Sequence, residues 1–157
     1  MLKQHPARLG AVFYWERELK IKAIIGALAI SLAAGTGAKA QFMTAAEVRP
    51  ILDATQSSWV AVRVYDGQDL LYFTHLLAFR CGLDAVFYGI NGEPPRERLP
   101  LEPCYEGTAS PGAMDPVNYP PYTAFPAGSV HSVTILMKYD DGGKTEATFQ
   151  RAQIQIQ

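Results

Sequence analysis

Only two cysteines, Cys81 and Cys104, occur in the 157-residue chain, and a bond between them would close a loop in the middle of the sequence. Such a bridge over about two dozen residues is worth roughly 3 kcal/mol, a large share of the stability of a small domain. A reactive thiol and a metal pair are the alternatives. No Cys-x-x-Cys motif supports a redox site, and zinc would need further ligands, for which only His75 and His131 remain after residue 40. The compartment decides between these readings, because cysteines in an exported chain of this size usually pair.

The first forty residues predict an export signal. Residues 23–34 read AIIGALAISLAA, an uncharged apolar run that follows Lys20 and Lys22. Small residues two apart end at Ala40, so we expect cleavage after that residue. A membrane anchor is the alternative, but only 16 residues separate Lys22 from Lys39, whereas a spanning helix needs about 20 apolar residues. The sequence therefore predicts a periplasmic or secreted protein with two structural cysteines and no membrane span after cleavage.

The start of translation and the charge of the mature chain follow from the same segment. Glu16 and Glu18 are unusual in a basic flank, so we expect the true start near Leu19. The mature chain would be a single domain over 41–157, with thirteen acidic and eight basic side chains and a net charge of −5. This balance argues against nucleic acid or anionic lipid as a partner.

A short helix is predicted at the start of the mature domain, over 44–56. Thr44 and Glu47 fit a capping box, in which each side chain bonds the other's backbone amide. Apolar residues at 48, 51 and 52 then recur at helical spacing. Pro50 falls in the second turn and is expected to bend the helix.

Short strands with hairpin turns are predicted along most of the remaining chain. The segment 70–79 is apolar on both alternating faces, which favours a buried strand but leaves a helix as the alternative. The turns expected to reverse the chain are Asp66-Gly67, Asn91-Gly92 and Asp140–Gly143. The strands expected are 59–65, 70–79, 84–90, a short edge strand at 96–101, 129–139 and 144–156.

Two irregularities are predicted as well. Seven prolines and glycines punctuate 104–126, which predicts one long loop. In 144–156 the apolar phase changes from Ala147 and Phe149 to Ile154 and Ile156. Such a slip of one residue predicts a β-bulge near Gln150-Arg151.

These elements predict a mainly β fold, an antiparallel β-sandwich of immunoglobulin-like architecture with one short N-terminal helix. The segment Tyr65–Leu83 resembles a group of small exported, alphaproteobacterial-type proteins with no assigned activity. The motifs Tyr88-Gly-Ile-Asn-Gly92, Pro103-Cys104 and Tyr139–Gly142 extend the resemblance over most of the mature chain. The resemblance implies the disulfide and the sandwich and brings no activity with it.

Candidate catalytic and metal residues are few. His75 lies in the densest apolar segment, where a histidine bonded to a backbone carbonyl is the simpler interpretation than a general base. No Gly-x-Ser-x-Gly or His-Glu-x-x-His motif indicates a hydrolase. Asp140 and Asp141 offer only two carboxylates where calcium needs about six to eight oxygens, so a hairpin turn is favoured. No cofactor is implied.

The segment NYPPYTAFP carries the most distinctive side chains. Tyr119, Tyr122 and Phe125 are three residues apart, and the prolines beside them favour polyproline II, which has three residues per turn. The three rings would then line one edge and could bind a glycan or an extended protein partner. The alternative is that the rings cover an open edge of the core.

The sequence therefore predicts a non-enzymatic binding or accessory module of the cell envelope. A small periplasmic hydrolase or lyase using His75, with Arg80 or Asp69, is one alternative. A structural subunit of an envelope assembly is the other, and an exposed strand edge would indicate it.

Overall fold

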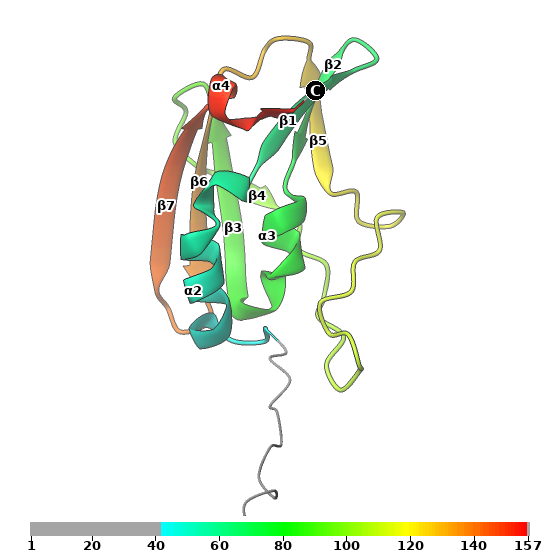
Figure 1. Ribbon diagram of the computed structural model, residues 1–157, viewed down its shortest axis with the longest axis vertical. Helices are drawn as coiled ribbons and strands as arrows, with labels where there is room; N and C mark the ends of the chain where they lie inside the picture. The colour runs from blue at the N-terminus through cyan, green and yellow to red at the C-terminus, as the bar shows by residue number, and fades with distance from the viewer. Residues whose placement is uncertain (1–41, 157) are drawn as a thin grey trace, which may run out of the picture. The chain divides into compact units, whose positions relative to one another are not determined.

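The computed structural model describes residues 42–156, which form a mainly β domain with two sheets and few helices (Figure 1). The expected signal peptide over 1–40 and the expected start near Leu19 lie outside the described residues. No helix found between residues 42 and 156 is long and apolar enough to cross a membrane. The immunoglobulin-like class of the fold stays a prediction.

Each sheet has four strands, and every pairing is antiparallel except that of β1 with β8. The first sheet has the order β5-β2-β1-β8 and the second the order β4-β3-β6-β7. In chain order the elements are α2 (Ala45–Ala54), η1 (Gln56–Ser58), β1 (Ala61–Tyr65), β2 (Gln68–Tyr72), α3 (Thr74–Ala78), η2 (Arg80–Gly82), β3 (Leu83–Ile90), β4 (Glu97–Leu99), β5 (Tyr122–Pro126), β6 (Ser132–Tyr139), β7 (Lys144–Gln150), α4 (Arg151–Ile154) and β8 (Gln155–Ile156).

Side chains from both sheets and from α2 and α3 form one hydrophobic core. Figure 1 shows α2 and α3 in front of the second sheet. Val48 and Leu52 of α2 are buried together with Val133, Ile135 and Met137 of β6, which occupy alternate positions of that strand. The regular alternation of β6 is therefore what the sequence pattern predicted: one face packs against the core and the other is turned away from it.

The start of α2 differs from the predicted capping box. The Thr44 side chain accepts no backbone bond; its hydroxyl donates to Glu47 Oε2 at 3.2 Å. That Glu47 oxygen accepts the Met43 amide at 2.9 Å, and Asp140 Oδ1 accepts the Ala45 amide at 3.0 Å. The hairpin between β6 and β7 thus supplies part of the cap, which satisfies a helix amide that has no partner within the helix.

The single strand expected over 70–79 is wrong beyond Tyr72. Strand β2 ends there, the Phe73 amide donates to the Pro121 carbonyl at 2.8 Å, and the Leu77 amide donates to the Phe73 carbonyl at 3.0 Å as α3 begins. The helix that periodicity left open is therefore present over Thr74–Ala78. An apolar run without breakers can bury its side chains as either structure, and the contact with Pro121 lies outside the run itself.

Two further expectations need correction. The chain near Gln150-Arg151 forms no bulge. Instead, helix α4 connects β7 of the second sheet to β8 of the first, and Ile154 of α4 is buried in the core. The loop expected over 104–126 ends early, because β5 occupies Tyr122–Pro126. Proline is tolerated at 126 because β5 is an edge strand within the described chain, with β2 as its one neighbour there.

The predicted disulfide is confirmed. Cys81 and Cys104 are bonded with their Cα atoms 5.7 Å apart and a sequence separation of 23, and residues 42–156 contain no free cysteine. The bridge joins η2 to the segment that follows β4. It therefore fixes the start of the long loop against the end of α3.

Candidate functional site

The outer face of the first sheet exposes several aromatic side chains. Strand alternation buries Val62 and Leu71 on the inner face. The alternate positions of the four paired strands face the other way. They place five residues on the outer face of the sheet: Arg63, Tyr65, Tyr72, Tyr122 and Ile156. Tyr65 is 60% exposed, Ile156 48% and Tyr122 42%. We call these five residues the tyrosine face.

Three adjoining hollows cover the tyrosine face and its border. The loop groove, of about 440 Å³, lies between α3, the end of β4 and residues 114–123, and Tyr122 lines it. The central hollow, of about 280 Å³, shares Tyr122 with the loop groove. The His75 hollow, of about 550 Å³, shares Arg63 and Tyr72 with the central hollow. The rings of Tyr72 and Tyr122 lie 5.3 Å apart between centroids, so neighbouring hollows adjoin one another at shared side chains of the tyrosine face.

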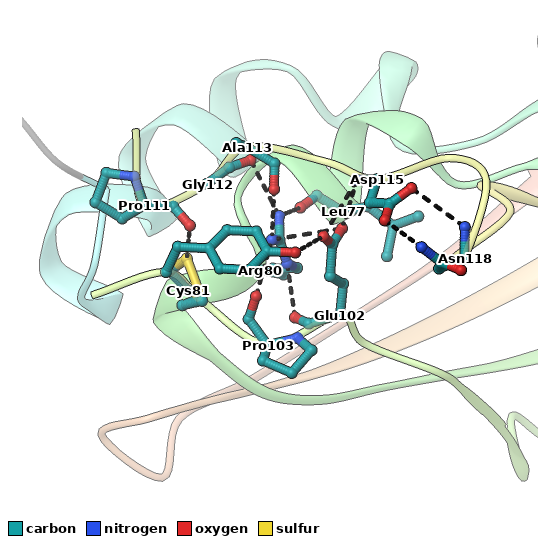
Figure 2. A network of polar contacts seen from close by, with 12 residues as sticks. Leu77, Arg80, Cys81, Glu102, Pro103, Pro111, Gly112, Ala113, Asp115 and Asn118 are labelled. Atoms are coloured by element: carbon teal, nitrogen blue, oxygen red, sulfur yellow. Dashed lines mark hydrogen bonds and ion pairs between the residues drawn. A yellow bond between two sulfur atoms is a disulfide. The ribbon is translucent and has the colours of Figure 1, made fainter. Parts of the chain in front are cut away.

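A buried arginine holds the wall of the loop groove in place (Figure 2). Arg80 is 2% exposed, and its guanidinium donates five hydrogen bonds to backbone carbonyls. Its acceptors are the carbonyls of Leu77, Glu102, Pro103, Gly112 and Ala113, at 2.7–3.1 Å. These are all the donors that a guanidinium has, so Arg80 joins α3 to both arms of the long loop.

The carboxylate of Glu102 continues this network toward the groove. It lies 3.5 Å from Arg80 Nη2 and is 4% exposed. It accepts the Tyr105 hydroxyl at 2.6 Å and the Asp115 amide at 3.1 Å. The bond to Glu102 raises the pKa of the Tyr105 phenol. Glu102 itself lines the loop groove, so a carboxylate already held by Arg80 forms part of its wall.

Asp115 fixes the turn that leads to Tyr119. Its Oδ2 accepts the Asn118 side-chain amide at 2.5 Å, its Oδ1 accepts the amides of Val117 and Asn118, and its carbonyl accepts the Tyr119 amide at 2.9 Å. The Asn118 side chain is the main cause that lowers the pKa of Asp115. A chain of bonds therefore runs from Arg80 through Glu102 and Asp115 to Tyr119, which lines the groove and is 39% exposed.

The structure brings two of the three predicted binding residues together. Tyr119 and Tyr122 line the loop groove, whereas Phe125 pairs opposite Asp69 and packs against the core. The predicted polyproline row is therefore wrong from Tyr122 onward. Positions three apart in a strand lie on opposite faces, so Tyr122 and Phe125 point away from each other.

The sequence reasoning missed Arg63, Tyr65 and Tyr72. The strand predicted over 59–65 contains Arg63 and Tyr65, and their spacing of two residues could have placed both on one face. Tyr72 was assigned to a strand buried on both sides, so its half-exposed position was not expected. The pairing of Tyr72 with Tyr122, 50 residues later in the chain, carries no local signal.

His75 is not joined to Arg80 or Asp69. Its Nε2 lies 2.7 Å from Thr55 Oγ1, and the Thr55 hydroxyl donates to the Ile51 carbonyl at 2.6 Å. Since a hydroxyl has one hydrogen, Nε2 is the donor in the first bond. Burial lowers the pKa of His75, which favours the neutral imidazole. Among residues 42–156 no hydrogen bond joins His75 to Ser58, the one serine that lines the same hollow.

Asp69 forms a buried ion pair with Arg151 that has a structural role. It is fully buried, and Arg151 binds it through two bonds, Nη1 to Oδ2 at 2.6 Å and Nη2 to Oδ1 at 2.9 Å. Its Oδ2 also accepts the Val130 amide at 3.0 Å. The Arg151 bond is the main cause that holds the pKa of Asp69 far below its usual value. The carboxylate thus joins β2 to α4 rather than facing a ligand.

The acidic turn between β6 and β7 also has a structural role. Asp140 caps α2, and Asp141 accepts two bonds from Arg49 Nη2 at 2.7 and 2.8 Å. A bond from the Gly143 amide is the main cause that lowers the pKa of Asp141. Within the described part of the chain, no three His, Cys, Asp or Glu side chains are grouped so that they could hold a metal ion.

No known protein family, curated protein or solved structure matches this chain significantly. The resemblance to small exported bacterial proteins therefore stays a prediction, and the function has to be argued from the site.

Proposed function

We propose that the protein is a non-enzymatic binding module, exported to the periplasm or beyond, whose ligand is a glycan chain laid across the tyrosine face. The single observation that carries this proposal is the continuity of that surface. Exposed tyrosine rings and three hollows that share residues follow one another across the first sheet. The disulfide supports the export step, because such bonds persist in oxidising compartments.

The dimensions of the surface favour an extended ligand. Neighbouring strands are about 4.8 Å apart. The first sheet, in the order β5-β2-β1-β8, therefore spans about 14 Å, and the loop groove continues beyond β5. A compact small molecule would occupy one hollow and leave the other two empty. A chain of linked units matches a row of adjoining hollows.

The chemistry of the surface favours sugars. Tyrosine combines an apolar ring, on which the C–H face of a sugar can pack, with a hydroxyl that bonds sugar hydroxyls. Arg63, Asp66 and Gln68 line the central hollow beside those rings. Planar charged and amide side chains supply directed hydrogen bonds to a polyhydroxylated ligand.

The edge of β5 argues against a peptide that would extend the sheet. The Phe73–Pro121 bond sets the antiparallel alternation, so the peptide groups of Tyr122 and Ala124 point away from β2. Pro121 and Pro126 bound this free stretch on both sides. Prolines and short length are features that protect an edge from strand addition.

The two sheets are proposed to pack as a sandwich, since their inner faces contribute to one core. The structural-subunit alternative rests on the free edge of β7 within the described residues. That strand alternates Lys144, Glu146 and Thr148 on its solvent side, and charges at an edge oppose edge-to-edge assembly. The binding module is therefore the better supported reading.

The test is a glycan array probed with the oxidised mature domain, followed by calorimetry with each oligosaccharide that binds. The double variant Tyr72→Ala/Tyr122→Ala should bind at least about tenfold more weakly, because both central rings are removed. Phe87→Ala is the matched control, since it removes a ring from the far face of the second sheet. Binding that is equal in both variants, or absent from every glycan, contradicts the proposal.

A further inference from the structure

The His75 hollow differs from the rest of the surface in its charge. Arg63 is the single residue with a formal charge among those that line it, and no aspartate or glutamate does so. The mature chain as a whole has an excess of acidic side chains. Arg63 is therefore the group in this hollow that can attract an anion.

Within the described chain, Arg63 has no carboxylate partner. Arg49, Arg80 and Arg151 each pair with a carboxylate, at 2.7, 3.5 and 2.6 Å. Arg63 forms no ion pair with any residue between 42 and 156; its guanidinium lies 5.5 Å from the centroid of the Tyr65 ring and its side chain is exposed. Stacking on a ring leaves the edge of the guanidinium, with its donors, available.

The other residues that line the hollow suit a sugar unit. Ser58, Thr74 and Tyr72 bring hydroxyl groups, and Ala61, Ala78 and Ile156 bring apolar surface. The indole N–H of Trp59 is already bonded to the Leu52 carbonyl at 2.8 Å and its side chain is fully buried, so Trp59 supports the floor of the hollow and offers no donor. Arginine, hydroxyls and apolar surface in one hollow are the groups needed for an acidic sugar.

We propose that the His75 hollow is a subsite for a uronic acid unit of the glycan, with the sugar carboxylate bound by Arg63. The inference rests on the proposed glycan-binding function and specifies the class of its ligand. An Arg–carboxylate pair is charge-assisted and bidentate, so it fixes the orientation of one unit as well as adding affinity. The remaining units of the chain then lie over the central hollow and the loop groove.

The experiment compares acidic oligosaccharides with their neutral methyl esters. The probes are hexamers of galacturonate, mannuronate and guluronate, measured by calorimetry with the wild-type domain, Arg63→Gln and the control Arg98→Gln. Arg98 is an exposed arginine of β4 that does not line the hollow. The acid form of at least one hexamer should bind the wild type and Arg98→Gln about tenfold more tightly than its ester.

Arg63→Gln should bind the acid and the ester equally, because the loss of the guanidinium and the loss of the carboxylate remove the same interaction. Affinity of the wild type for the acid should fall with added salt. If ester and acid bind the wild type equally while the Tyr72→Ala/Tyr122→Ala variant loses both, the glycan function stands and the acidic subsite is overturned. If no hexamer binds but hexaglutamate does and Arg63→Gln abolishes it, an acidic peptide is the ligand and both proposals are overturned.

Discussion

Replacement of Arg80 by lysine should destabilise the domain almost as much as removal of the charge altogether. Arg80 satisfies five carbonyl oxygens with five N–H donors. Lysine has three donors, so at least two of these carbonyls lose their partner. Each buried acceptor left unsatisfied costs about 1–3 kcal/mol. Because Pro103 and Ala113 are exposed and their carbonyls can be hydrated in part, we expect a loss of about 3 kcal/mol for Arg80→Lys.

The assay is urea unfolding of the oxidised protein, with Arg80→Met and Arg98→Lys measured beside it. Arg80→Met leaves the buried Glu102 carboxylate without its cation, which should cost about 3–5 kcal/mol. Arg98→Lys is the same change at an exposed site of β4 and should stay within about 0.5 kcal/mol of the wild type. Limited proteolysis should then cleave the Arg80 variants first between residues 102 and 118, the segment that Arg80 and Glu102 hold.

A loss below about 1 kcal/mol for Arg80→Lys would refute this reasoning, because it would mean that charge alone, and not the number of donors, holds the loop.

Two further predictions concern the covalent and the ionic links of the domain. The variant Cys81→Ala/Cys104→Ala should lose about 3 kcal/mol in urea unfolding, since the bridge joins two residues with a sequence separation of 23; an unchanged midpoint contradicts this. The pKa of Asp69 is lowered in the folded state, chiefly by Arg151, so its contribution to stability is present above its usual pKa and is lost as the pH falls below it. Unfolding free energy measured from pH 6 to pH 2 should therefore fall less steeply in Asp69→Asn, and equal slopes would exclude this role.

The hairpin turns and the disulfide could be predicted from the sequence, because each depends on the types of a few identifiable residues. The turn at Asp66-Gly67 has positive φ at both positions, 48° and 72°. The Asp-Gly dipeptide alone predicts such a turn, because both residues tolerate positive φ. Strand β6 follows an alternating apolar pattern, and its buried face is the predicted one throughout. The pairing of the two cysteines was predicted from the expected export of the chain and from the lack of residues that would complete a metal or redox site.

Elements whose structure depends on hydrogen bonds to residues far away in the sequence could not be predicted from the sequence. Whether 70–79 continued as a strand depended on the Pro121 carbonyl, which accepts the Phe73 amide. The place of Arg80 depended on five carbonyls from three segments, and backbone carbonyls have no sequence signature. The apolar slip near residue 150 was real, but a short helix produces the same slip as a bulge when the chain changes sheets.

The candidate site depends on strand register in a way that links it to the Arg80 network. Tyr122 lies on the tyrosine face only because it pairs with Tyr72; a slip of one residue would turn it inward and bring Thr123 out. No turn fixes this register, since β2 and β5 are separated by the whole of α3, β3, β4 and the long loop. The bonds from Arg80 through Glu102 and Asp115 to Tyr119 end three residues before Tyr122. A buried structural arginine is thereby linked to the start of β5, a strand of the tyrosine face. If that face binds the proposed ligand, loosening the Arg80 network should weaken binding even though Arg80 lines none of the three hollows.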